Sequence, residues 1–270
     1  MGKIFIRLYQ ILFAKKKFRK IHEATLRLSL RGLGILNYQT DKVSGEKHLL
    51  EKILVKKINS ASPIMFDVGA NVGEYSKSLS KYFPNASIYA FEPHPIIFKK
   101  LSENISPQLN INLFNLALGS KEAQIELFDR SEDDGSEHAS VYENVINEIH
   151  HVSAISHSVY VNTINNFAEK ENIEVIDFLK IDTEGHEYEV LKGASTLLST
   201  KKIKIIQIEF NEMNVISRVF FRDIQDILKN YDLYRLLPSG LLSLNTAKKI
   251  ETEVFGYQNL FATLKTDETK

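Results

Sequence analysis

Acidic, amide and glycine residues stand at the ends of several apolar runs that the sequence predicts as strands. They are Asp67, Gly69, Ala70, Asn71 and Gly73 after the first run, Glu92 after the second, Asn115 and Ala117 in the third, Asp182 and Glu184 after the run that ends near residue 181, and Glu209 after the next. The carboxyl ends of parallel strands meet at one edge of a sheet, where ligands of such folds bind. We therefore expect one site that contains these positions.

The segment IMFDVGANVGEY (64–75) predicts a strand, a glycine turn and a helix, which together form a ligand cradle. A dinucleotide site reads G-x-G-x-x-G, whereas here three residues separate the two glycines and Asn71 replaces the middle one. Asp67 would also repel a diphosphate and suit a cation. Glu92 is placed to accept hydrogen bonds from two ribose hydroxyls. A ribose without diphosphate, joined to a positive centre, describes S-adenosylmethionine.

Apolar segments of alternating strand and helix character must position these residues. The expected strands are 64–68, 86–92, 111–119, 124–129, a strand from 159, 175–181 and 202–209, and the expected helices are 45–58, 74–83, 95–105, a helix after 162, 187–198 and 220–231. This alternation predicts an α/β fold with a doubly wound, mostly parallel sheet. The segments 234–240 and 259–265 are expected to close it as an antiparallel pair.

Five motifs, in their order and spacing, resemble the FkbM family of S-adenosylmethionine-dependent methyltransferases. They are DVGANVGEYS, FEPHPIIFKKLSENI, NLALGS, FLKIDTEGHEYEVLKGA and IIQIEFNE, and they lie between Ser62 and Glu212. The resemblance implies a class I methyltransferase fold, Rossmann-like, with a seven-stranded sheet. It also implies methyl transfer, usually to a hydroxyl oxygen of a sugar, glycan or natural-product scaffold. Thr183, where the family commonly has Val, is a mild departure.

The same resemblance assigns the cofactor residues. Asp67, Gly69, Ala70, Asn71 and Gly73 would hold the methionine end, Glu92 the ribose, and Asn115 and Ala117 would lie by the adenine. A transfer from a sulfonium mainly requires alignment of donor and acceptor, and a base for the hydroxyl proton adds about two to four powers of ten. For this base or positioning role the candidates are Asp182 first, then His186, and Glu184. The alternative is that the acids of 184–189 simply favour the start of the following helix.

A divalent metal is a further expectation. Asp182, Glu209 and Glu212 offer hard oxygen ligands that would suit Mg²⁺ together with substrate hydroxyls, although no fixed local spacing supports them. The adjacent His150 and His151 are read as loop residues near the substrate, because successive side chains seldom face the same way. The chain has no cysteine, which excludes a thiolate nucleophile and suits a reducing cytoplasm.

The N-terminal part, 1–44, is expected to be a basic, helical extension of a methyltransferase domain that spans 45–270. Between residues 1 and 31 nine Lys and Arg stand against one acid, Glu23. Apolar residues at helical spacing beside this cluster are typical of an amphipathic helix on an anionic membrane surface or on a partner. The alternative is a solvated helix that packs on its own domain. The apolar run is too short to span a bilayer.

Two other classes of function remain open on the sequence alone: a nicotinamide-dependent oxidoreductase on the same fold, and a non-catalytic nucleotide-binding module. The 34 basic and 34 acidic residues cancel, so no global field favours nucleic acid. A small molecule or glycan is the expected partner, and contact with the inner face of the membrane depends on the extension. The polar segment 131–157 is the expected substrate loop or lid.

Overall fold

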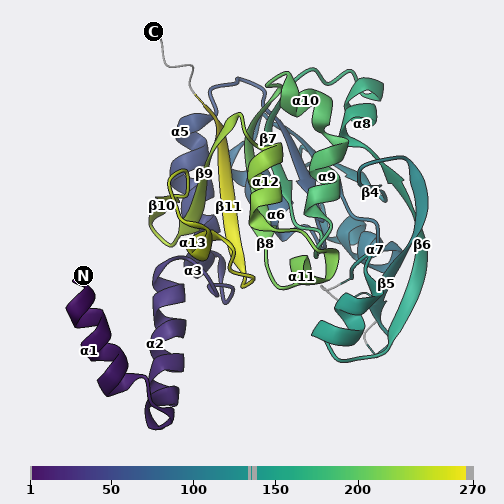
Figure 1. Cartoon of the computed structure of the whole chain (residues 1–270). Coiled ribbons are helices and arrows are strands. Elements are labelled where there is room, and N and C mark those ends of the chain that lie inside the picture. The colour runs from purple at the N-terminus through teal and green to yellow at the C-terminus, as the bar shows by residue number, and fades with distance from the viewer. Residues whose placement is uncertain (1, 133–134, 136–138, 266–270) are drawn as a thin grey trace.

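Five parallel strands form one side of the main sheet, and three antiparallel strands form the other side (Figure 1). The computed structural model describes residues 2–132, 135 and 139–265. The strands, in their order across the sheet, are β10 (Gly240–Ser243), β9 (Tyr231–Leu237), β11 (Gln258–Leu264), β8 (Ile203–Phe210), β7 (Ile176–Ile181), β1 (Ile64–Val68), β2 (Ser87–Phe91) and β3 (Ile111–Phe114). The doubly wound, mostly parallel α/β fold is thereby confirmed.

The sheet has eight strands, one more than predicted. The additional strand is β10, which follows a tight turn and runs back along β9, with Gly240 opposite Leu237. The antiparallel pairing of β9 with β11 agrees with the sequence. The strand order reverses at β1, which lies between β2 and β7, so the carboxyl end of β1 is the expected ligand position.

Helices cover both faces of this sheet (Figure 1). They are α3 (Asp41–Ser44), α4 (Glu46–His48), a π-helical turn (Leu49–Leu54), α5 (Val55–Lys57), α6 (Glu74–Tyr82), α7 (Pro95–Asn104), α8 (Ile164–Lys170), α9 (Glu187–Gly193), α10 (Ser195–Ser199), α11 (Met213–Ser217), α12 (Phe221–Ile227) and α13 (Lys249–Thr252). Apolar residues of α8, α9 and α12 pack on one face in the largest core cluster. The π-helical turn and α6 pack on the other face. Burial of these apolar stripes holds the strand ends in place.

A second, three-stranded sheet lies beside α7 and carries one wall of the site (Figure 1). It has the order β4 (Ala117–Leu118), β6 (Ala154–Asn162), β5 (Ala123–Arg130). The prediction of a single strand over 111–119 was therefore wrong, because the chain leaves the main sheet at Asn115. The amide of Asn115 donates to the carbonyl oxygens of Glu92 and Pro93 and holds this bend.

The expected irregular segment 131–157 is shorter than predicted. A π-helical turn (Val145–Ile149) interrupts it, and β6 already begins at Ala154. β5 pairs with β6 over the whole length of β5. Residues 133–134 and 136–138 of this segment, with the acids Asp133, Asp134 and Glu137, lie outside the described residues.

The N-terminal residues form two helices that stand away from the sheets (Figure 1). α1 (Lys3–Phe13) is followed by a 3-10 turn (Lys16–Phe18) and by α2 (Arg19–Gly32), and none of their residues is buried. The chain joins the body at Ile35, which is buried. Within the described residues, no helix combines the length and the apolar character needed to cross a membrane.

Candidate active site

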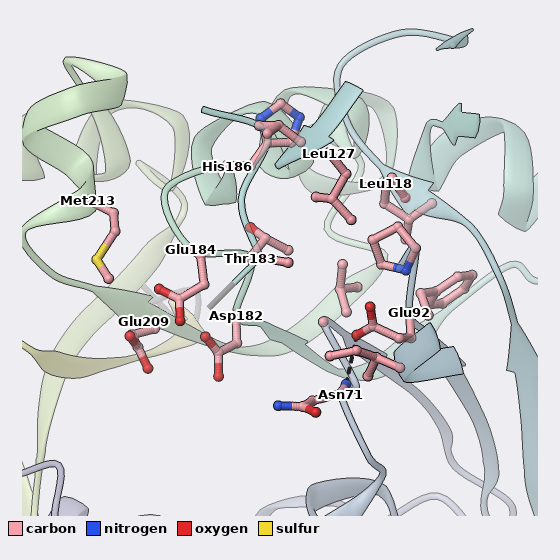
Figure 2. A pocket seen from close by; sticks show the side chains of 18 of the residues that line it. Asn71, Glu92, Leu118, Leu127, Asp182, Thr183, Glu184, His186, Glu209 and Met213 are labelled. Carbon is pink, nitrogen blue, oxygen red and sulfur yellow. Dashed lines mark hydrogen bonds between the residues drawn. The ribbon is translucent and has the colours of Figure 1, made fainter. Parts of the chain in front are cut away.

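A cavity of about 580 Å³ opens at the carboxyl ends of β1, β2, β7 and β8, which is the position that the strand order predicts. Its size lies in the range of small-molecule and cofactor sites. One part of its wall is apolar and includes Ile97, Leu116, Leu118 and Leu127. Figure 2 shows the other part, where carboxylates gather on the opposite side from Leu118 and Leu127.

Three successive backbone N–H groups in the glycine turn after β1 are already paired within the fold. Gly69 and Ala70 both donate their N–H groups to the carbonyl oxygen of Phe91, at 3.0 and 2.9 Å. Asn71 donates its N–H to Glu92 at 2.9 Å. Gly69 has a φ of 81°, and a Cβ there would lie 1.7 Å from the carbonyl oxygen of Asp182. The turn is thus locked to the neighbouring strands, which disfavours the nicotinamide dinucleotide that the sequence left open.

Glu92 joins this turn to the next one and faces the cavity. One carboxylate oxygen accepts from the Asn71 N–H and the other from the His94 N–H at 2.9 Å. Burial raises the pKa of Glu92 to about 7, although both hydrogen bonds act in the opposite direction. A ribose hydroxyl would add a donor to a carboxylate that has lost its water, so the residue suits the predicted ribose role.

Asn71 supports the fit to a cationic amino-acid group. Its φ is 49°, and its buried side-chain oxygen has no hydrogen-bond partner among the described residues. An acceptor without a partner at a cavity wall is costly unless a ligand supplies a donor. The ammonium group of S-adenosylmethionine is such a donor. The cofactor therefore fits the residues that this turn presents.

Asp67 lies beneath the turn and does not line the cavity. Its side chain is fully buried and accepts a hydrogen bond from Ser76 at 2.6 Å. Lys180, opposite Asp67 in the β1–β7 register, places its Nζ 3.9 Å from Asp67 and 2.9 Å from Asp182. Burial alone would lower the pKa of Lys180, but the surrounding carboxylates outweigh it and raise that pKa. Lys180 therefore fixes the position of Asp182 at the cavity.

Three carboxylates, those of Asp182, Glu184 and Glu209, lie close together at the cavity (Figure 2). Burial, and then the charges of Asp182 and Glu184, raise the pKa of Glu209 well above its usual range. Asn211 donates to Glu209 at 2.6 Å. None of the described residues that line the cavity is Lys or Arg. This part of the cavity is therefore lined by acidic groups, which can form hydrogen bonds with the hydroxyl groups of a ligand.

The expected metal set is not assembled. Among the described residues there is no group of three or more His, Asp and Glu side chains arranged to hold a metal ion. Asp182, Glu209 and Glu212 line the same cavity. Glu212 is exposed.

His186 lies apart from these carboxylates, on the far side of Thr183 in Figure 2. Its Nδ1 is 3.4 Å from the hydroxyl of Tyr142, and its Nε2 faces Gly119. Burial lowers the pKa of His186 to about 4, so the ring is neutral at pH 7. In the structure, His186 is therefore separated from Asp182, the first catalytic candidate.

The loop between β7 and α9 is held by Glu187. This side chain accepts hydrogen bonds from the N–H groups of Thr183 and Gly185, both at 3.0 Å, and Asn214 donates to its other oxygen at 3.3 Å. Glu184 has a φ of 51° within this loop. Glu187 thus holds the loop that precedes α9.

The remaining predicted residues divide between the cavity wall and its support. Ala117 and His150 line the cavity. Asn115 holds the bend after β3, and His151 is exposed. Ala70 is buried in the turn, and Gly73 begins α6 where a Cβ would meet Leu101 at 2.7 Å. These support residues position the cofactor turn.

Sequence reasoning missed Lys180 and two tyrosines. Tyr38, from the segment after α2, and Tyr257, before β11, line the cavity with their rings 6.0 Å apart. Lys180 had a signal, since it is a buried cation in a strand whose other residues, apart from Asp177, are apolar. Neither tyrosine had one, because each is far in sequence from the motifs.

The fold and this site define a class I methyltransferase. The model of the FkbM methyltransferase domain matches residues 67–235, which is more than half of the chain. The chain therefore belongs to the FkbM methyltransferase family and is an S-adenosylmethionine-dependent enzyme.

Several relatives are named methyltransferases. The chain is 22% identical over 196 residues to the 2-O-methyltransferase NoeI of Sinorhizobium fredii, covering 70% of this chain and 80% of that protein. It is 29% identical over 166 residues to the hexuronic acid methyltransferase AglP of Haloferax volcanii, covering 61% of this chain and 62% of that one. Among solved structures, a methyltransferase FkbM from Methylobacillus flagellatus aligns with a TM-score of 0.44 at 14% identity, covering 94% of this chain and 62% of that one.

Proposed function

We propose that the protein transfers a methyl group from S-adenosylmethionine to a hydroxyl oxygen of a neutral, hydroxyl-rich acceptor, a sugar or a glycan. The observation that carries this proposal is the group of Asp182, Glu184 and Glu209 in a cavity whose described lining has no Lys or Arg. Carboxylates accept hydrogen bonds from sugar hydroxyls and repel an anionic acceptor.

The cavity has two halves with different chemistry. The cofactor half comprises Asn71, Glu92 and the apolar wall around Leu118, which suit the amino-acid, ribose and adenine groups. The acceptor half comprises the three carboxylates, Asn211 and the tyrosine rings. When bound, the cofactor supplies an electrophilic methyl group whose positive charge already resides on the donor. The protein has to align the acceptor with it.

Asp182 is the residue that we assign to the acceptor proton. It faces the cavity with a partly exposed side chain, and Lys180 fixes one of its oxygens at 2.9 Å. The second oxygen is then oriented to accept a hydrogen bond from the acceptor hydroxyl. His186 is neutral and also lines the cavity, but its ring lies beside Tyr142. We therefore assign His186 to positioning.

The name of one relative supports transfer to oxygen, and the name of another supports a sugar acid as the acceptor. NoeI is named for a 2-O position, whereas AglP is named for a hexuronic acid. The negative acceptor half favours a neutral sugar over an acidic one for this chain. Because the sequence identities to these relatives are low, we base the choice between a neutral and an acidic sugar on the residues of the cavity.

The test uses the purified full chain with methyl-labelled S-adenosylmethionine and a panel of neutral methyl glycosides and their hexuronic acids. We expect label on a hydroxyl of one or more neutral sugars, as an ether that resists mild base. Label confined to the carboxyl group of the acids, as a base-labile ester, would contradict the proposal. The absence of any melting-temperature increase with S-adenosylhomocysteine would contradict the cofactor half independently.

A further inference from the structure

The N-terminal helix pair, residues 3–32, presents an apolar surface that nothing in the described chain covers. Large hydrophobic residues occupy eight of the eleven positions of α1, and all eight are exposed: Ile4, Phe5, Ile6, Leu8, Tyr9, Ile11, Leu12 and Phe13. Ile4 is 86% exposed, and Leu28 of α2 is 70% exposed. Single exposed hydrophobic residues are ordinary, but a continuous group marks an interaction surface.

The two helices are held together where the chain turns. The hydroxyl of Tyr9 is 3.2 Å from Nδ1 of His22, and Nε2 of His22 is 2.9 Å from the carbonyl oxygen of Phe13. The rings of Phe13 and Phe18 lie 5.5 Å apart. These contacts stabilise a helical hairpin at its turn. The apolar side chains of the hairpin are exposed to solvent.

Strong positive charge accompanies this apolar surface. Residues 1–31 contain nine Lys and Arg and one Glu, a net charge of 9 − 1 = +8, although the whole chain is neutral. Three of the lysines, Lys15, Lys16 and Lys17, lie in the exposed turn between the helices. Arg19 is paired with Glu23, which leaves the other basic residues of this surface without an acidic partner within it.

This combination distinguishes between the occupants that would cover the surface. A second copy of the same hairpin would bring +8 against +8, which opposes association. The helix pair does not pack on its own domain, since none of its residues is buried. An anionic lipid bilayer complements both properties, because apolar side chains enter the headgroup boundary while Lys and Arg meet the lipid phosphates.

We propose that the N-terminal helix pair binds an anionic phospholipid bilayer as an in-plane, peripheral anchor. The proposal does not depend on the acceptor assigned above. Each basic residue near an anionic surface contributes about a fivefold increase in membrane partitioning, and the apolar side chains add to it.

The anchor is joined to the active site by a short connection. α2 ends at Gly32, and Tyr38, six residues later, lines the cavity. Six extended residues span at most about 20 Å. Arg235 donates to the carbonyl oxygen of Leu33 at 3.3 Å, and Leu36 donates to the carbonyl oxygen of Tyr257 at 2.7 Å. The bound bilayer would therefore lie close to the acceptor half of the cavity.

Co-sedimentation of the full chain with vesicles tests the proposal. Vesicles of phosphatidylcholine alone are compared with vesicles that contain phosphatidylglycerol, at low and high salt. We expect binding to the anionic vesicles that weakens at high salt, and little binding to the neutral ones.

Two variants separate the two contributions. In the first, Lys15→Gln, Lys16→Gln and Lys17→Gln together should weaken anionic-vesicle binding roughly a hundredfold. In the second, Ile4→Ser, Leu8→Ser and Leu12→Ser together should abolish it. The matched control neutralises three exposed lysines of the body, Lys121, Lys170 and Lys229, and should bind as the parent does.

Three outcomes would overturn the proposal. They are equal binding to neutral and anionic vesicles, equal weakening by the control, and binding that persists in the Ser variant. A concentration-dependent dimer in sedimentation velocity that the Ser variant abolishes, without vesicle binding by the parent, would assign the surface to a second copy instead. Unchanged melting temperatures of all variants exclude unfolding as the cause of any loss.

Discussion

The two halves of the cavity are built in different ways, and the difference explains what each can recognise. The cofactor half depends on backbone groups that are already paired, together with Glu92, whose two oxygens both accept backbone N–H groups. The acceptor half depends on side chains, above all Asp182, Glu184 and Glu209, which come from strand ends and a loop. The first half is rigid and suits one fixed cofactor, while the second can change with a few substitutions.

The largest expected effect comes from the turn of the cofactor half. Gly69→Ala places a Cβ 1.7 Å from the carbonyl oxygen of Asp182 and requires a left-handed residue at φ 81°. We expect destabilisation by more than about 4 kcal/mol, because β1 and β7 must separate. Chemical denaturation measures this. Gly240→Ala, where nothing lies within 4 Å, is the control and should leave stability unchanged. Similar stability of both variants would contradict the close approach.

Asp182→Asn tests the acceptor half without changing its shape. The amide cannot take the hydroxyl proton, so kcat should fall by roughly a hundred- to ten-thousandfold. The dissociation constant for S-adenosylhomocysteine, measured by calorimetry, should change little. The control is Glu212→Gln, an exposed carboxylate of the same cavity, which should keep most of its activity. If the substitution weakened only cofactor binding, Asp182 would belong to the cofactor half of the cavity.

Glu92→Gln is expected to do the reverse. The ribose hydroxyl loses its hydrogen bond to a carboxylate. The new side-chain NH₂ of Gln also faces one of the two backbone N–H groups that Glu92 accepts from, those of Asn71 and His94. S-adenosylhomocysteine should therefore bind roughly ten- to a hundredfold more weakly. Calorimetry is again the measurement, with the exposed Glu103→Gln as the control. An unchanged dissociation constant would remove Glu92 from the cofactor half.

The smallest effect is a dependence of stability on pH. Burial raises the pKa values of Glu92 and Glu187 from 4.5 to about 7. The folded state then binds more protons than the unfolded state between these values, so stability falls as the pH rises through this window. Melting temperatures between pH 5 and about 8 should show this decline. The decline should be shallower in Glu92→Gln and unchanged in Glu103→Gln, and equal slopes in all three would contradict the assignment.

The same contrast explains how much the sequence could predict. The cofactor half lies in contiguous motifs, so the turn, Glu92 and the alternation of strands and helices were readable in order. The acceptor half gathers Tyr38, Tyr257 and α11 from segments far apart, and only the tertiary fold brings them together.

Two errors in the fold have local causes. The strand expected over 111–119 divides because Asn115 binds backbone carbonyl groups instead of continuing the ladder. The eighth strand, β10, is short and pairs only with β9, so its few residues carry little periodic signal. Asp67 was expected to hold the methionine end of the cofactor, but its side chain lies beneath the turn, because its contacts with Ser76 and Lys180 are made inside the core.

The most direct test of the account is the ratio of kcat/KM for a neutral hexose glycoside to that for its hexuronic acid, with S-adenosylmethionine as the donor. The negative acceptor half predicts a preference for the neutral sugar of about tenfold or more. The combined variant Glu184→Gln and Glu209→Gln should narrow this ratio. A preference for the uronic acid in the parent enzyme, or a ratio that the variant leaves unchanged, would contradict the assignment of the carboxylates to a neutral acceptor.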